Sequence, residues 1–211
     1  MNILKKIRNF FFNEIQTKEY LQFISDGGDE LIFKNIILKD NSVTIDGGGF
    51  DGEFTDEILK KNCQNIYIYE PDPYFFKNLI RKYQLNNRVK ILNLALFDKD
   101  KKMNLSENSN ASSIMESTNK GRIINAVDVY NEFKKFEKID LFKLNIEGAE
   151  YDVLLRLIEK NELNKVKYLL VQFHKEHDLA EVKYNNILPK IKKEFDVIFN
   201  YKYVWSLFVK K

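Results

Sequence analysis

A short apolar run that ends in a cluster of glycines constrains the fold of this chain more than any other feature. The run covers residues 43–45, and the cluster that follows comprises Asp46, Gly47, Gly48, Gly49 and Gly52. Glycine lets a backbone turn sharply and approach a ligand closely, so a strand, a tight loop and a helix are expected in succession. Open α/β sheets contain such units and bind ligands at the carboxyl ends of their strands.

Glu70 is an acid at the equivalent place on the next strand. The β-rich run 65–69 ends at this residue, and Pro71 follows it directly. A carboxylate at this position can accept hydrogen bonds from both hydroxyls of a ribose. Asp46, the glycines and Glu70 together predict a site for a cofactor that contains a nucleoside.

Two classes of cofactor fit the glycines. Gly47, Gly49 and Gly52 satisfy the pattern G-x-G-x-x-G, which would indicate a nicotinamide-dependent oxidoreductase. The acids around the loop favour S-adenosylmethionine instead, because Asp46 and Asp51 would repel a pyrophosphate but suit a cationic methionyl group. A glycine turn without a ligand and a non-catalytic nucleotide-binding scaffold are the remaining alternatives.

Beyond the loop, β-rich and helical patterns alternate. Helices are expected at residues 53–61, 74–84, 150–160 and 182–193, and strands at 42–45, 65–69, 89–94, 139–146, 167–173, 195–199 and 203–209. Alternation of this kind forms parallel βαβ units, and the last two strands form a hairpin. The prediction is a doubly wound α/β domain with a mostly parallel seven-stranded sheet and an antiparallel edge strand.

The two ends of this domain and one long connection carry further expectations. Residues 3–24 have apolar side chains at helical spacing, so residues 1–40 are expected to form an N-terminal helical extension and residues 41–211 the main domain. The helix would dock on the domain or on a second subunit of a homodimer, with peripheral membrane contact as the alternative. The polar segment 98–127 reads as a long loop, whose part 104–119 is expected to gate the acceptor.

A second polar cluster follows the fourth expected strand. If that strand continues through residue 146, Asn145 and Glu147 point to the same side, above the first strand. His174 leaves the fifth strand at the same end, and histidine is the commonest general base for a hydroxyl that must lose its proton. His174, Glu147 and Asn145 are therefore the catalytic candidates, with purely structural roles as the alternative. No accepted ligand spacing links His174, His177 and Glu147, so no metal site is predicted.

Composition limits the partners and the compartment. The 34 basic and 31 acidic residues give a net charge of +3, which is too even to indicate a nucleic-acid platform, so no nucleic-acid partner is expected. No apolar run approaches the roughly 20 residues of a membrane-spanning helix. Cys63 is the single cysteine, so an internal disulfide is excluded and a cytoplasmic location is expected.

In these motifs the chain resembles the FkbM family of methyltransferases, over about residues 42–175. Asp46–Gly52 matches an Asp-x-Gly-Ala-Asn-x-Gly type loop, Tyr69-Glu70-Pro71 a Phe-Glu-Pro motif, and Asn93-Leu94-Ala95 an Asn-x-Ala-like motif. Further matches are Ala111-Ser112-Ser113-Ile114 to a Ser-Ser loop, Val127-Asp128-Val129 to an Asp-Leu-like helix start, and residues 143–150 to Lys-Ile-Asp-Val-Glu-Gly-Ala-Glu, the most specific of the set.

The resemblance implies an S-adenosylmethionine-dependent O-methyltransferase that acts on a sugar or polyketide hydroxyl, in bacteria often in surface-polysaccharide biosynthesis. On this hypothesis the methionyl part is held by Asp46, Gly47, Gly48 and Gly52, the ribose by Glu70 and Pro71, and the adenine side is lined by Asn93 and Ala95. Two departures bear on the roles. Asn145 stands where the family has Asp, which weakens a role there as base or metal ligand. Phe50 replaces the family's Asn and is expected to pack on the cofactor or on a helix.

Overall fold

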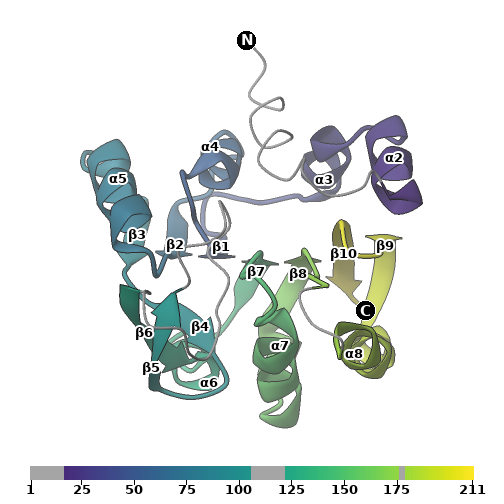
Figure 1. Cartoon of the computed structure of the whole chain (residues 1–211). Coiled ribbons are helices and arrows are strands. Elements are labelled where there is room, and N and C mark those ends of the chain that lie inside the picture. The colour runs from purple at the N-terminus through teal and green to yellow at the C-terminus, as the bar shows by residue number, and fades with distance from the viewer. Residues whose placement is uncertain (1–16, 106–121, 176–178) are drawn as a thin grey trace.

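The computed structural model describes residues 17–105, 122–175 and 179–211. Its centre is a seven-stranded sheet with the order β3-β2-β1-β7-β8-β10-β9 (Figure 1). The strands are β1 (Val43–Gly47), β2 (Asn65–Tyr69), β3 (Val89–Leu92), β7 (Ile139–Leu144), β8 (Val166–Val171), β9 (Phe195–Tyr201) and β10 (Trp205–Lys210). The first five of these run parallel, so the predicted mostly parallel sheet is confirmed.

The antiparallel strand β10 lies one position in from the edge. It pairs antiparallel with both β8 and β9, which leaves β9 as the edge strand. Leu207 and Phe208 of β10 are fully buried, whereas Asp196 and Val197 of β9 are exposed. The terminal hairpin therefore places its more deeply buried strand inside the sheet, and its more exposed strand lies at the edge.

Helices cover both faces of the sheet, as expected for a doubly wound fold (Figure 1). One face carries α2 (Lys18–Ser25), α3 (Asp29–Asn35), α4 (Glu53–Leu59) and α5 (Pro73–Tyr83). The other carries α6 (Val129–Phe133), α7 (Glu150–Glu159) and α8 (Ala180–Glu194), and the short 3-10 helix η1 (Leu163–Lys165) precedes β8. Local sequence explains the start of α5, because the Asp72 side chain accepts from Tyr74 N–H and Pro73 occupies the first turn.

β7 is the central strand, and all six of its side chains are buried. A parallel strand covered by helices on both faces is normally apolar throughout. β7 departs from this rule at Asp140 and at Lys143, which is 4% exposed. Because successive side chains alternate between faces, Lys143 shares with Leu141 the face that α4 covers. A buried lysine requires hydrogen-bond or ion-pair partners, and Lys143 finds them in Asp46 and in the carbonyl oxygens of the glycine loop.

The segment 98–127 was expected to be a loop, and this expectation is wrong in part. β5 (Lys101–Leu105) and β6 (Arg122–Asp128) form a small sheet with β4 (Ala95–Phe97), in the order β4-β6-β5. Only alternate side chains of these strands face inward, among them Met103 and Ile124, and the polar residues between them hide the strand pattern. Most of the proposed gate, residues 106–119, lies outside the described residues.

The described part of the N-terminal region packs on the sheet. α2 begins at Lys18, so most of the helix expected at 3–24 lies outside the described residues. Phe23, Ile32 and Ile36 are buried in a cluster with side chains of β2, β8 and β10. The division at residue 40 stays a prediction. Among the described residues, no helix is long and apolar enough to cross a membrane.

Candidate functional site

The glycine loop leaves β1 at the carboxyl edge of the sheet, where the strand order reverses. β2 lies on one side of β1 and β7 on the other, which is the place where open α/β sheets bind their ligands. Gly48 has φ +83°, and a Cβ on it would lie 1.9 Å from the carbonyl oxygen of Asn145. Only glycine allows the loop to pass this closely over the end of β7.

The other glycines of the loop make room for the protein's own side chains. A Cβ on Gly49 would lie 2.2 Å from Cγ2 of Ile68, and a Cβ on Gly52 would lie 2.5 Å from the hydroxyl of Tyr83. In a dinucleotide site the second glycine of G-x-G-x-x-G lets the backbone approach the pyrophosphate. Gly49 is the second glycine of that pattern, but it packs on β2. The structure therefore gives no support to a dinucleotide site.

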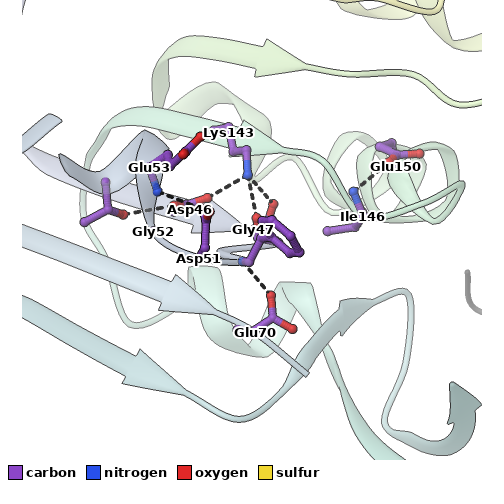
Figure 2. Close-up of polar contacts among 12 residues, drawn as sticks. Asp46, Gly47, Asp51, Gly52, Glu53, Glu70, Lys143, Ile146 and Glu150 are labelled. Atoms are coloured by element: carbon purple, nitrogen blue, oxygen red, sulfur yellow. Dashed lines mark hydrogen bonds and ion pairs between the residues drawn. The ribbon is translucent and has the colours of Figure 1, made fainter. Parts of the chain in front are cut away.

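Asp46 lies beneath the loop and is fully buried. Its Oδ2 accepts a hydrogen bond from the Thr55 hydroxyl at 2.9 Å, and its Oδ1 lies 2.9 Å from Nζ of Lys143. Nζ of Lys143 also donates to the carbonyl oxygens of Gly48, at 2.7 Å, and Gly47, at 3.3 Å (Figure 2). The ammonium group thus uses three acceptors to join β1, β7 and the loop. Asp46 contributes to the site by fixing the loop from below.

Glu70 stands at the carboxyl end of β2 and faces the same loop. Its Oε2 accepts from Phe50 N–H at 2.7 Å, and its Oε1 accepts from Asp72 N–H at 2.8 Å. Burial raises the pKa of Glu70 to about 7, although the two backbone N–H groups act to lower it. Phe50 has φ +48° and packs on Phe75 of α5, with ring centroids 4.3 Å apart. Of the two expectations for Phe50, the structure shows the contact with a helix.

The residues after β3 stabilise the turn that carries Glu70. The side-chain amide of Asn93 donates to the carbonyl oxygens of Glu70 and Pro71, at 2.9 Å each. Ala95 is 3% exposed and lies in the core of the small sheet, paired with Ala126. Asn93 therefore fixes the turn that carries Glu70, and the adenine-side role of Asn93 and Ala95 stays a prediction.

The polar cluster after β7 does not continue the strand, contrary to the expectation. β7 ends at Leu144, and Glu147 has φ +53° in a turn that leads into α7. Asn145 and Glu147 are therefore not placed by strand alternation. Oδ1 of Asn145 is buried and accepts no hydrogen bond from the described residues, which leaves an acceptor at the edge of the glycine loop.

His174 follows β8 and meets this turn. Its Nδ1 lies 2.8 Å from Oε1 of Glu150, and its Nε2 lies 3.5 Å from Oε2 of Glu147. Two of the three catalytic candidates, His174 and Glu147, are therefore in contact. His177 lies outside the described residues. Within the described part of the chain, no group of three or more His, Cys, Asp or Glu side chains could hold a metal ion.

Lys143, Thr55 and Glu150 belong to the site and were missed as site residues. Lys143 and Glu150 stood inside the motif of residues 143–150, and a charge within an otherwise apolar strand was a signal that Lys143 needs a partner. No comparable signal marks Thr55, because a threonine in a first helical turn is common.

Comparison with known proteins places the chain among methyltransferases. The family model described as the methyltransferase FkbM domain matches residues 46–201. A search of curated proteins by sequence finds no match. Among solved structures, the FkbM methyltransferase from Methylobacillus flagellatus KT superposes with a TM-score of 0.58 at 13% identity, over 84% of this chain and 47% of that one. The chain thus spans about half the length of that relative.

Two bacterial structures match over nearly their whole length. A protein from Streptococcus mutans, described as a candidate methyltransferase and solved in complex with SAH, has a TM-score of 0.55 at 14% identity, over 87% of this chain and 97% of that one. An rRNA methylase from Streptococcus thermophilus has a TM-score of 0.52 at 12% identity, over 87% of this chain and 95% of that one. The exclusion of nucleic acid as a partner, drawn from net charge, is wrong, because this fold also serves a protein described as acting on rRNA.

Proposed function

Because the chain belongs to the FkbM family of methyltransferases, we propose that it transfers a methyl group from S-adenosylmethionine to a hydroxyl of a sugar or glycan precursor, as in polysaccharide biosynthesis. The family resemblance and the prediction of an S-adenosylmethionine-dependent methyltransferase are confirmed by the family match and by the structural neighbours. The observation that carries the cofactor proposal is the Glu70 carboxylate, held against the glycine loop by Phe50 N–H.

The residues at the edge of the sheet fit a nucleoside with an amino-acid tail. Each oxygen of Glu70 accepts one backbone N–H and keeps acceptor capacity for a ribose hydroxyl. The buried Oδ1 of Asn145 offers a further acceptor beside Gly48. Asp46 and Lys143 hold the loop but make no contact with the cofactor in this proposal. The bound cofactor supplies a methyl group on sulfur, whose C–S bond breaks as the C–O bond forms.

His174 and Glu147 support oxygen as the acceptor atom. A hydroxyl must lose its proton as it becomes an ether, and His174 accepts that proton at Nε2. Oε2 of Glu147 lies 3.5 Å from this nitrogen, close enough to accept a hydrogen bond from a neighbouring hydroxyl. Adjacent hydroxyls are a property of sugars, which is why we favour a sugar over an isolated alcohol.

The proposal is tested in two steps. Calorimetry is expected to show binding of S-adenosylhomocysteine to the wild-type chain and strongly reduced binding to Glu70→Ala, while NAD gives no heat. The chain is then incubated with methyl-labelled S-adenosylmethionine and a cell extract, with His174→Asn as the matched control. Label in O-methyl sugars or glycans supports the acceptor class, and label confined to RNA overturns it. A chain that does not bind S-adenosylhomocysteine overturns the cofactor assignment.

A further inference from the structure

Glu150 makes more contacts within the site than an ordinary acid at a helix start. It begins α7, and its side chain is fully buried. Oε1 accepts from Ile146 N–H at 2.8 Å (Figure 2), and Oε2 accepts from Gly148 N–H at 2.9 Å. Oε1 also lies 2.8 Å from Nδ1 of His174. One carboxylate therefore contacts the turn that carries Glu147 and the ring that faces it.

The contact with His174 determines which ring nitrogen carries the proton. A carboxylate only accepts hydrogen bonds, so a neutral His174 must keep its proton on Nδ1 to use this contact. The lone pair of the ring then lies on Nε2. A free histidine side chain prefers the opposite arrangement, with the proton on Nε2. We propose that Glu150 is the positioning residue of His174: it holds the proton of the neutral ring on Nδ1 and makes Nε2 the basic nitrogen.

The geometry shows which of the two neighbouring acids controls the ring. The separation of 2.8 Å between Glu150 and Nδ1 is that of a charge-assisted hydrogen bond. The separation of 3.5 Å between Glu147 and Nε2 is longer than such a bond. The Glu150 side chain is also fully buried, whereas that of Glu147 is 15% exposed. Electrostatic interactions strengthen as water is excluded, so Glu150 dominates.

The same carboxylate couples the orientation of the ring to the position of Glu147. Two N–H groups of the turn point at Glu150, so the positive φ of Glu147 is maintained by the group that orients His174. A second anchor acts on the backbone, where the Tyr151 hydroxyl donates to the carbonyl oxygen of His174 at 2.9 Å. Tyr151 does not bond the ring in this contact and therefore provides a matched control.

The test is 15N NMR spectroscopy of the intact chain. The sequence contains two histidines, His174 and His177, so a chain labelled with 15N-histidine gives two ring systems, and His177→Gln assigns them. Long-range proton–nitrogen spectra are recorded as the pH is raised until the ring of His174 is neutral. In the wild type and in Tyr151→Phe the proton is expected on Nδ1. In Glu150→Met, which removes every acceptor oxygen, it is expected to move to Nε2.

The outcomes separate this inference from the proposed function, on which its catalytic meaning rests. A neutral wild-type ring with its proton on Nε2 overturns the role of Glu150 without any variant, even if Glu150→Met fails to fold. A Glu150→Met ring that keeps its proton on Nδ1 overturns it too. Calorimetry with S-adenosylhomocysteine on the same wild-type sample tests the proposed function separately, because cofactor binding does not depend on the tautomer.

Discussion

Replacement of Lys143 by methionine tests whether the buried ion pair holds the glycine loop. The side chains of Lys143 and Asp46 are 5% and 0% exposed, and their charged atoms lie 2.9 Å apart. Methionine keeps most of the volume of lysine, so the substitution removes the charge without opening a large cavity. It leaves Asp46 as a buried carboxylate whose remaining side-chain partner is the Thr55 hydroxyl.

The expected cost follows from this burial. Removal of one partner of a buried pair destabilises a protein by about 3–5 kcal/mol, because the other charge stays buried without compensation. The carbonyl oxygens of Gly47 and Gly48 lose a donor in the same substitution. A domain of this kind has about 5–15 kcal/mol of stability in total, so Lys143→Met is expected to remain folded but to unfold at clearly lower urea concentration.

A double-mutant cycle isolates the pair itself. Asp46→Asn combined with Lys143→Met removes both charges, and the double variant is expected to be about 2 kcal/mol more stable than the sum of the single variants predicts. Urea unfolding followed by circular dichroism gives the free energies. Lys183→Met is the control, because the Lys183–Asp152 pair is about one-third exposed on both sides and should contribute about 1 kcal/mol or less.

Two results would refute this reasoning. If the free energy of unfolding of Lys143→Met lies within about 1 kcal/mol of that of the wild type, the ion pair contributes no more than a solvent-screened surface pair. If the cycle shows no coupling, the two charges do not depend on one another. Calorimetry provides the functional readout, since a displaced loop should also weaken binding of S-adenosylhomocysteine.

Three further predictions concern the glycine loop and Glu70. Gly48→Ala is expected to cost about 4 kcal/mol or more and to abolish cofactor binding, whereas Gly27→Ala, also at positive φ but with no atom closer than 3.9 Å, should cost about 1–3 kcal/mol in urea unfolding. Burial raises the pKa of Glu70 from 4.5 to about 7, so ionisation of this carboxyl should increase the affinity for adenosine about tenfold between pH 6 and pH 8. The affinity of Glu70→Gln for adenosine should not change over this pH range. The same shift should lower the free energy of unfolding by about 3 kcal/mol as the pH rises from 4.5 to 7, because the folded state keeps Glu70 protonated up to a higher pH than the unfolded state does.

Much of the fold could be predicted because its signals are local. The apolar runs of β1, β2, β7 and β8 end in glycines, acids or a histidine, and each such end marks the carboxyl edge of a parallel strand. The small sheet was missed because β5 and β6 bury only alternate side chains against one layer. Several outward side chains of these strands are polar, and the inward face becomes evident only when the partner strand is present.

The site divides in the same way. Glu70 could be predicted, since its place after β2 fixes which end of the sheet it faces. The contacts of His174 could not, because they depend on a turn whose conformation comes from positive φ at Glu147 and Gly148. Sequence spacing places Glu147 on an extended strand, which would bring Asn145 and Glu147 to the same side. The structure instead brings Glu147 and Glu150 to the two nitrogens of the His174 ring.

The acids at this edge of the sheet carry out two different tasks, and burial distinguishes them. Asp46 and Glu150 are fully buried, and each is held by donors of the protein itself, Lys143 and Thr55 in one case and two turn N–H groups with His174 in the other. Glu70 is buried but 6% exposed, and the Glu147 side chain is 15% exposed. In sequence the two pairs cannot be told apart, because Asp46 and Glu147 adjoin a glycine whereas Glu150 and Glu70 do not. In the proposed function Asp46, which is paired with Lys143, and Glu150, whose Oε1 already contacts two nitrogens, fix the geometry, whereas Glu70 and Glu147 meet the ligands.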